Sequence, residues 1–211
     1  PGSVLLLGGE PGIGKSTLLL QVAAGVAATG RTVLYVSAEE SAHQIRLRAE
    51  RLGALRPRLL VVAETSVPNV LAHIDEVVPD LVIVDSIQTV HDPDVASAPG
   101  SVAQVREASA RLVAVAKSRD LATVLVGHVT KDGALAGPRV LEHVVDTVLS
   151  FEGDRHHGLR MLRATKHRYG STAEVGVLEM NGGGLAAVAD PSELFLTDRR
   201  RGVPGSVVVP A

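Results

Sequence analysis

The chain has 211 residues, of which 45% are hydrophobic and 21% charged, a balance that fits one packed domain with a tail and argues against disorder. With no cysteine it can form neither disulfides nor thiolate-bound zinc or iron–sulfur sites, and a formal net charge of −2 excludes nucleic-acid binding through bulk positive charge. No apolar run reaches the roughly 18–20 residues that span a bilayer, and no signal peptide is visible, so we expect a soluble, cytoplasmic protein.

Short runs rich in Val and Leu alternate with helical patterns along most of the chain. This alternation is typical of βαβ units with a parallel sheet, so we predict an α/β fold with a mostly parallel twisted sheet flanked by helices. The predicted strands cover residues 4–7, 32–37, 59–62, 81–85 and 123–126.

Three helix starts are visible between these strands, at Lys15, Ser41 and Ser101. Gln44 and Gln104 follow the two serines at the spacing of a capping box, in which paired side chains satisfy the first helical N–H groups. The helix after Ser101 also carries an apolar stripe, which predicts its buried face. The stripe consists of Val102, Val105, Leu112 and Val115.

The pattern changes after about residue 145 to alternating segments. We predict antiparallel strands at 147–151, 159–165 and 175–180 that extend the sheet, with a turn at the glycines 182–184. The core is expected to cover 1–196. Residues 197–211, with three consecutive arginines, two prolines and two glycines, are expected to form a linker toward an absent domain.

Residues 9–16 are Gly-Glu-Pro-Gly-Ile-Gly-Lys-Ser, which matches the phosphate-loop pattern G-x-x-x-x-G-K-[ST] between a predicted strand and a predicted helix. The glycines let backbone N–H groups surround a β-phosphate at a helix N-terminus. Lys15 is expected to reach the β- and γ-phosphates, and the Ser16 hydroxyl to bind Mg²⁺. The expected nucleotide contacts are Gly9, Glu10, Pro11, Gly12, Ile13, Gly14, Lys15, Ser16 and Thr17.

Two carboxylates at the ends of predicted strands suit the chemistry of a magnesium nucleotide. Asp85 ends an apolar strand and is expected to hold the metal's water shell, although an Asp in this position also caps turns. Glu39, after the second strand, is expected to orient or deprotonate the attacking water. Glu40 is an alternative base, and both glutamates also suit the N-terminus of the helix at Ser41.

His128 follows the strand 123–126, so it is expected at the same edge of the sheet, where it suits a sensor of the γ-phosphate. A lone His also serves as a capping or packing residue. A GTPase is excluded because no glycine follows Asp85 as it does in switch II, and because residues 130–132 lack the spacing of a guanine-reading Asn-Lys-x-Asp.

Several of these motifs together resemble the RadA/Sms family of bacterial DNA repair proteins. They are the phosphate loop, Ser-Ala-Glu-Glu-Ser at 37–41, the stretch 97–106, Gly-His-Val-Thr-Lys at 127–131 and the stretch 136–143. The most specific is Lys166-His167-Arg168-Tyr169-Gly170, which is similar to that family's Lys-Asn-Arg-Phe-Gly signature with His for Asn and Tyr for Phe.

The resemblance implies a RecA-like P-loop ATPase core that binds ATP and Mg²⁺ and drives branch migration as a DNA helicase. It also implies a homo-hexamer that acts on single-stranded or branched DNA, with the recombinase RecA as a partner. In such rings Lys166 and Arg168 would reach the neighbouring subunit's nucleotide and stabilise transition-state charge. Solvated charges at a strand end are the alternative. The family also carries an N-terminal zinc ribbon and a C-terminal Lon-protease-like domain, and neither is found in these residues.

Two loops are expected to face the channel of such a ring. The loop 89–100 contains no Lys or Arg, whereas the loop 130–138 contains Lys131 and is followed by Arg139, so these two cations are the expected DNA contacts. Flexible solvent loops are the alternative. No metal site is expected at His156 and His157, because adjacent extended residues point to opposite faces.

Two other functions stay open at this stage. One is a nucleotide-switched DNA filament in which hydrolysis only triggers release, and the other is a KaiC-like regulator that binds protein instead of DNA.

Overall fold

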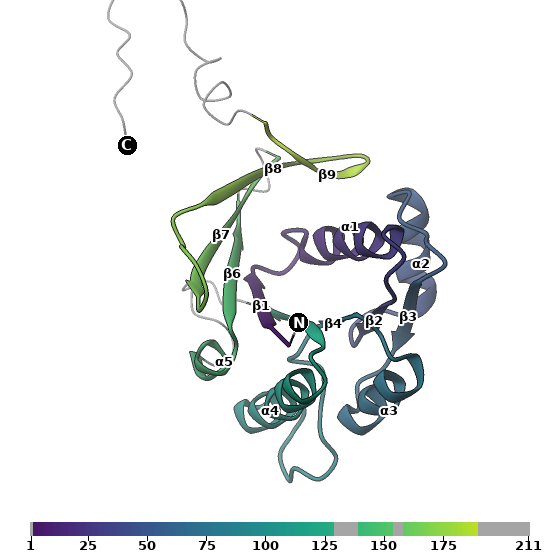
Figure 1. The fold of residues 1–211 in the computed structure, drawn as a ribbon, viewed down its shortest axis with the longest axis vertical. Helices are drawn as coiled ribbons and strands as arrows, with labels where there is room; N and C mark the ends of the chain where they lie inside the picture. Colours follow the sequence, from purple (N-terminus) through teal and green to yellow (C-terminus); the bar gives the residue numbers. More distant parts are fainter. Residues whose placement is uncertain (1, 129–138, 154–157, 190–211) are drawn as a thin grey trace, which may run out of the picture.

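The computed structural model describes residues 2–128, 139–153 and 158–189. Within them one nine-stranded sheet has the order β3-β2-β4-β5-β1-β6-β7-β8-β9 (Figure 1). In chain order the elements are β1 (Val4–Gly9), α1 (Lys15–Ala28), β2 (Val33–Ser37), α2 (Ala42–Arg51), β3 (Leu59–Ala63), α3 (Val67–Val77), β4 (Leu81–Asp85), α4 (Val102–Ser118), β5 (Ala122–His128), α5 (Arg139–Val144), β6 (Thr147–Glu152), β7 (Leu159–His167), β8 (Val175–Asn181) and β9 (Gly184–Ala187).

The parallel half of the sheet is covered on both faces, which is why its strands are continuous apolar runs. All residues of β2 and β4 are buried. Helices α1 and α2 pack on one face around Leu20 and Ile45, and α3 and α4 pack on the other around Ile74 and Leu112 (Figure 1). The five strands predicted in this half are confirmed, and their carboxyl ends meet at one edge.

The antiparallel half differs from the prediction in two details. Strand β6 pairs parallel with β1 and only then antiparallel with β7, so it is the last parallel strand. Alternating side chains could not give its direction, because the period of two is the same in both kinds of sheet. A further strand, β9, follows the predicted glycine turn and pairs with β8.

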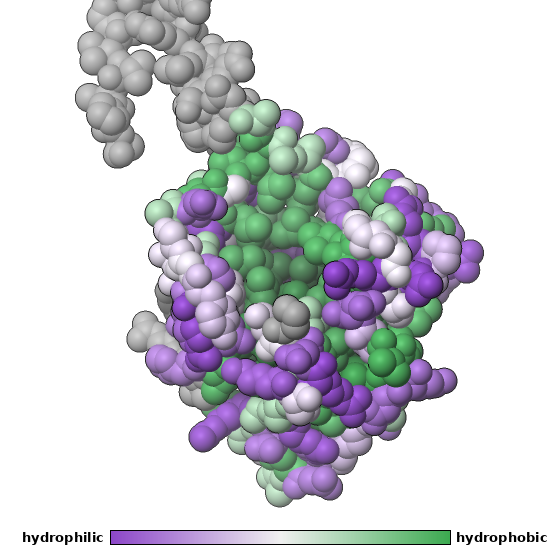
Figure 2. Space-filling view, viewed as in Figure 1, coloured by the Kyte–Doolittle hydropathy of each residue, from purple (hydrophilic) through white to green (hydrophobic). Residues whose placement is uncertain are grey.

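The antiparallel strands curve over α1 and support the loop between β1 and α1 (Figure 1). The buried Arg160 of β7 donates from Nε to the Ile13 carbonyl at 2.9 Å. The inside of the curve is lined by hydrophobic residues (Figure 2), including Leu162, Leu178 and Met180, which pack against the core on the α1 face. This half of the sheet therefore backs the loop as well as extending the fold.

The helix start at Ser41 is a complete capping box, as predicted, but the one at Ser101 is not. Ser101 accepts from the Gln104 N–H, while the Gln104 side chain turns away and binds the preceding loop instead. Its amide accepts from the Asp92 N–H at 2.8 Å and donates to three loop carbonyls. A buried amide saturates its hydrogen bonds wherever partners are available, and the loop offers four.

The predicted apolar stripe of α4 is also partly wrong. Val105 and Leu112 are buried, but Val102 is 57% exposed because it sits in the first turn, beyond the edge of the core. Among the described residues no helix is long and apolar enough to cross a membrane. The predicted linker 197–211 lies outside the described residues.

Replacing Gln104 tests how much its hydrogen bonds to the loop before α4 stabilise the protein. Gln104→Ala leaves the buried Asp92 N–H without its acceptor, so we expect a loss of about 1–3 kcal/mol in the free energy of unfolding. Gln44→Ala removes the same side chain from the same helix position at an exposed site and should cost less than about 1 kcal/mol. Urea unfolding followed by circular dichroism measures the free energy of unfolding of each variant. Equal losses would contradict the role of Gln104 in holding the loop.

Candidate nucleotide-binding site

The loop between β1 and α1 has the backbone that a phosphate requires. Gly14 stands before the first helical residue with φ of 115°, and a Cβ there would lie 2.5 Å from the Met180 Cε. A Cβ on Gly9 would lie 2.5 Å from the Phe151 carbonyl oxygen. Only glycine therefore fits at either position. In the part of the chain that the structure describes, no side chain caps α1, so its first N–H groups are available to an anion.

The Lys15 ammonium is buried inside this loop. Its Nζ donates to the Gly9 carbonyl at 2.7 Å and to the Glu10 carbonyl at 3.0 Å, and it lies 3.2 Å from the Nδ1 of His128. Burial lowers the pKa of Lys15, while the negative charges of Asp85 and Glu39 oppose that shift. Phosphate oxygens can replace these acceptors with a full negative charge, which suits the role predicted for this side chain.

Glu39 and His128 meet at the same edge, as their strand-end positions predict. The Nε2 of His128 lies 2.8 Å from the Glu39 Oε1, and Ser86 donates to the same oxygen at 2.5 Å. Because an ammonium only donates, Lys15 makes Nδ1 of His128 the acceptor, and the ring proton on Nε2 is then donated to Glu39. A chain of hydrogen bonds thus runs from Lys15 through His128 to Glu39.

The hydrogen bond from His128 is the main reason that the pKa of Glu39 is lowered to about 2. Partial burial opposes this shift, and the hydrogen bond from Ser86 and the charge of Lys15 add to it. Glu39 is therefore a carboxylate throughout the physiological range.

Glu40 has different hydrogen-bond partners from Glu39. This difference distinguishes the two glutamates, either of which the sequence allowed as the base. Its Oε1 accepts from the Nη2 of Arg48 at 2.6 Å, on α2. The Ser37 hydroxyl donates to the Glu40 carbonyl at 2.8 Å. Glu39 thus joins the phosphate loop, while Glu40 is tied to the helix beside it. Sequence reasoning missed Arg48 because its partner is eight residues away along a turn and a helix.

Asp85 and Ser16, the two residues predicted for the metal, are brought together by a third side chain. Tyr35 of β2 donates its hydroxyl proton to the Asp85 Oδ2 at 2.6 Å, and the Ser16 side chain lies near the same phenol, where it opposes the rise in the Tyr35 pKa. Burial and the negative Asp85 raise the pKa of Tyr35. The peptide bond from Asp85 to Ser86 is cis.

The donor set fits Mg²⁺, which takes hard oxygen ligands and is usually held by one or two protein groups together with substrate phosphates. One carboxylate and one hydroxyl at the phosphate loop meet that requirement. The described residues contain no cluster of three or more acidic or histidine side chains that could enclose a metal by themselves.

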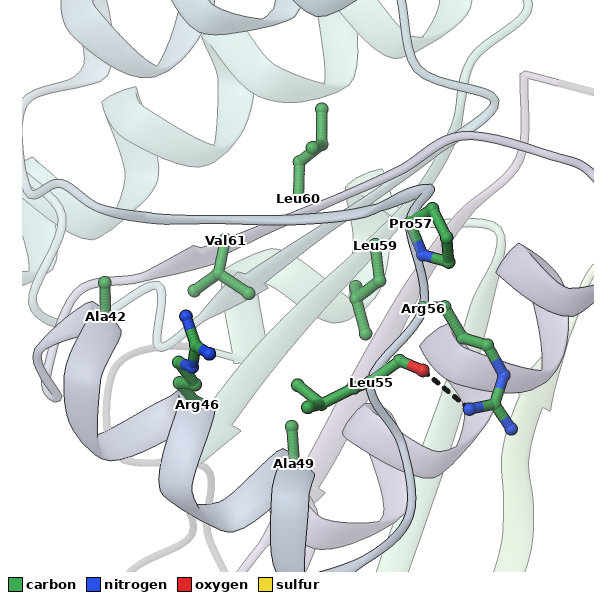
Figure 3. Close-up of a pocket in the computed structure, with 9 residues that line it drawn as sticks. All are labelled: Ala42, Arg46, Ala49, Leu55, Arg56, Pro57, Leu59, Leu60 and Val61. Atoms are coloured by element: carbon green, nitrogen blue, oxygen red, sulfur yellow. Dashed lines mark hydrogen bonds between the residues drawn. The ribbon is translucent and has the colours of Figure 1, made fainter.

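Lys15, Ser16, Glu39 and His128 line a cavity of about 310 Å³, whereas Asp85 and Tyr35 are not among its lining residues. Its lining adds two arginines of α2 to the predicted residues, and consists of Pro11, Gly12, Gly14, Lys15, Ser16, Thr17, Glu39, Glu40, Arg48, Arg51 and His128. A larger cavity of about 560 Å³ lies between α2 and β3 (Figure 3). Apolar groups such as Leu59 and Val61 line most of it, and it contains none of the predicted site residues, so the smaller, polar cavity is the candidate site.

Lys166 and Arg168 do not join this cavity. His167 pairs with Thr147, which pairs with Leu5 near the start of β1, whereas the phosphate loop follows the end of β1. Both cations therefore lie at the opposite edge of the sheet. Lys166 donates to the carbonyls of Glu142 and Val145, and Arg168 forms an ion pair with Asp146 at 3.0 Å.

Of the two loops predicted to contact DNA, only 89–100 lies within the described residues. It is held against α4, because the buried Asp92 accepts from the Arg111 guanidinium, which lowers the pKa of Asp92. Lys131 lies outside the described residues, and Arg139 begins α5 with a side chain that is not described.

Removing the imidazole of His128 tests the cause of the low Glu39 pKa. His128→Ala deletes its strongest hydrogen bond, so the pKa of Glu39 should rise from about 2 toward the ordinary value near 4.3. An NMR titration of the carboxyl carbon, assigned with Glu39→Gln, measures it. His43→Ala, an exposed histidine on α2, is the control and should change nothing.

His128→Ala should also change how the free energy of unfolding depends on pH. A folded-state pKa below the unfolded one stabilises the native state above the unfolded pKa, and this contribution is lost as pH falls toward about 2. His128→Ala should therefore lose less stability than the wild type between about pH 4.5 and pH 2. Parallel loss in the two proteins would contradict the assignment.

Comparison with known proteins identifies relatives of this chain. Residues 1–134 match the family described as an AAA domain. A DNA repair protein RadA from Listeria monocytogenes is 58% identical over 209 residues, and one from Streptococcus pneumoniae is 56% identical over the same length. These alignments cover 99% of this chain but only 46% and 50% of the relatives, so the chain spans about half of their length.

Two solved structures show the same fold at low sequence identity. A KaiC-like protein from Pyrococcus horikoshii matches with a TM-score of 0.70 and 19% identity over 89% of both chains. A DnaB-like replicative helicase matches with a TM-score of 0.75 and 14% identity, over 88% of this chain and 57% of that one. These matches concern the fold alone, and they confirm the predicted RecA-like α/β core. The chain therefore belongs to the AAA domain family, with a RecA-like core related over almost its whole length to bacterial DNA repair proteins named RadA.

Proposed function

We propose that this chain hydrolyses ATP with Mg²⁺ at the phosphate loop and uses the cycle to drive a DNA motor, a helicase that promotes branch migration in recombinational repair. The observation that carries the proposal is the hydrogen-bonded series of Lys15, His128 and Glu39 at the carboxyl edge of the sheet. The RadA relatives, whose name refers to DNA repair, support the setting.

Each residue of the series has a distinct chemical part. Lys15 places a buried positive charge beside the β- and γ-phosphates. Glu39, with its lowered pKa, is a weak base, so it acts mainly by accepting a hydrogen bond from the attacking water and orienting it. Asp85 and Ser16 would hold Mg²⁺, which would neutralise part of the negative charge that develops on the phosphate. Glu40, paired with Arg48, is outside this set.

His128 is suited to report whether a γ-phosphate is present. It accepts from Lys15 on one ring nitrogen and donates to Glu39 from the other. When Lys15 donates to a γ-phosphate, the His128 ring loses its hydrogen bond from Lys15. When the γ-phosphate leaves, that hydrogen bond forms again. Because His128 is the last residue of β5, this change is passed directly to the segment that follows, which contains Lys131.

The position of Lys166 and Arg168 supports catalysis between subunits. They lie at the edge of the sheet opposite the phosphate loop, so within one chain they cannot reach the nucleotide. A head-to-tail contact joins unlike surfaces of two copies, and repetition of that contact can close a ring. We therefore propose a homo-hexamer in which these two cations act on the neighbour's nucleotide.

The DNA contacts follow from the charges of the two candidate loops. The loop 89–100 is acidic and held against α4, which leaves the segment with Lys131 and Arg139 as the proposed grip on DNA phosphates. Single-stranded or branched DNA is the proposed substrate, the recombinase RecA a proposed partner, and the cytoplasm the place of action.

Three measurements separate this motor from the other candidates. Calorimetry with Mg-ATP tests nucleotide binding, and a folded protein that gives no heat would reject the whole proposal. DNA-stimulated ATP hydrolysis excludes a KaiC-like regulator that binds only protein. Unwinding of a forked substrate, compared with simple ATP-dependent retention on DNA, distinguishes a motor from a nucleotide-switched filament.

The two adjacent glutamates provide a matched test of the catalytic residue. Glu39→Gln should lower ATP turnover by about 10²- to 10⁴-fold and leave Mg-ATP binding intact, because it replaces the carboxylate that orients the attacking water with a neutral amide, a weaker acceptor and no base. Glu40→Gln removes only the charge that pairs with Arg48 and should have a much smaller effect on turnover. Initial rates and calorimetry measure both, and a larger effect at Glu40 would reverse the assignment.

Mixing two inactive variants tests catalysis between subunits. Lys15→Ala removes a chain's own phosphate contact, whereas Arg168→Ala should spare binding but lower turnover in assembled rings by up to about 10³- to 10⁵-fold. In mixtures some interfaces combine an intact loop with an intact Arg168, so activity should return. Arg163→Ala, an exposed arginine of β7, the strand that ends just before Arg168, is the control and should retain turnover. Failure of every mixing ratio to recover activity would argue against the trans arrangement.

A further inference from the structure

We infer that Tyr35 is a positioning residue for the magnesium site, whose hydroxyl holds Asp85 and Ser16 in the arrangement that a magnesium nucleotide needs. This inference rests on the proposed nucleotide chemistry and adds a residue to it. Neither the phosphate-loop pattern nor the acidic end of β4 indicates this tyrosine, which lies in the middle of β2.

The first observation is where the sheet places the phenol. Tyr35 is 0% exposed, and in the parallel register of β2 and β4 it stands opposite Ile83. Asp85 is two residues further along β4, so the long side chain runs along the sheet toward the carboxyl edge and meets the carboxylate there at 2.6 Å.

The second observation is that the hydrogen bonds have a fixed direction. A carboxylate only accepts, so the single phenolic proton goes to Asp85. The Tyr35 oxygen then has only lone pairs left to offer, so in a hydrogen bond between it and the nearby Ser16 hydroxyl the donor is Ser16. With its proton turned to Tyr35, the Ser16 oxygen is free to present lone pairs to a cation.

Packing alone does not explain the hydroxyl. The core on this face is apolar, and phenylalanine would fill the same space without a polar atom to satisfy. A buried hydroxyl is tolerated because it is hydrogen-bonded, and here its partner Asp85 and the nearby Ser16 are the two residues predicted for the metal. Groups that orient metal ligands in this way typically change metal affinity or activity by about 10- to 100-fold when they are removed.

Tyr35→Phe tests the inference by removing one oxygen. Calorimetry gives the affinity for ADP with Mg²⁺ and with EDTA, and the ratio of the two affinities measures the contribution of the metal. In the variant the ratio should fall by about 10-fold or more while metal-free ADP binding stays close to wild type. If Tyr35 only packed, Tyr35→Phe would leave the ratio unchanged, because phenylalanine fills the same space. Tyr169→Phe removes the same atom at a 71% exposed site and should keep the wild-type ratio.

A second measurement covers the case in which Tyr35→Phe does not fold. The chain has two tyrosines and no tryptophan, so in Tyr169→Phe protein Tyr35 is the only such chromophore. Adding Mg²⁺ to the ADP-bound protein should then change its tyrosine ultraviolet difference spectrum, because a cation comes to lie beside the carboxylate to which the phenol donates.

An unchanged affinity ratio in folded Tyr35→Phe protein, or a flat spectrum in the single-tyrosine protein, would overturn the inference while the proposed function stands. If wild-type protein fails to bind ADP with or without Mg²⁺, the proposed function itself is rejected.

Discussion

The site is organised around one constraint, a buried positive charge on Lys15 at the point where β1 turns into α1. Burial disfavours an ammonium, so the surroundings must compensate it. They do so with two loop carbonyls, the His128 ring and the nearby charges of Asp85 and Glu39. The negative charge of a bound triphosphate can stabilise the ammonium in place of these groups. Binding of the nucleotide therefore changes the hydrogen bonds at the ends of β2, β4 and β5.

Each of these three strands contributes different polar residues at the carboxyl edge of the sheet. The ends of β2 and β5 supply Glu39 and His128, and the end of β4 supplies Asp85 and Ser86. Parallel strands bring these residues together because their carboxyl ends share an edge. Within one chain the strands that follow β5 brace the phosphate loop: Arg160 of β7 donates to the Ile13 carbonyl, and the Phe151 carbonyl of β6 leaves room only for glycine at position 9.

The opposite edge of the sheet has its own charge centre at Asp146. This buried carboxylate accepts from the Val4 N–H at 3.0 Å, pairs with Arg168 at 3.0 Å and lies 3.6 Å from the Lys117 ammonium. In the proposed ring, Arg168 would have to exchange this partner for a phosphate on the next subunit, so Asp146 competes with the nucleotide for the same cation. The two edges thus differ in chemistry, as a head-to-tail assembly requires.

Much of the site could be predicted from the chain alone, because local patterns carried it. The spacing of the glycines and Lys15, the acidic end of β4 and the polar residues after β2 and β5 each follow from a few neighbouring residues, and the topology of a parallel sheet then brings them to one edge. What only the tertiary structure decided are the contacts between residues far apart in sequence. Glu39 rather than Glu40 meets His128, 89 residues away, Tyr35 meets Asp85, 50 residues away, and Gln104 leaves its capping box for the loop. The direction of β6 was undetermined for a related reason, since a strand has the same side-chain period in either orientation and only its partner fixes it.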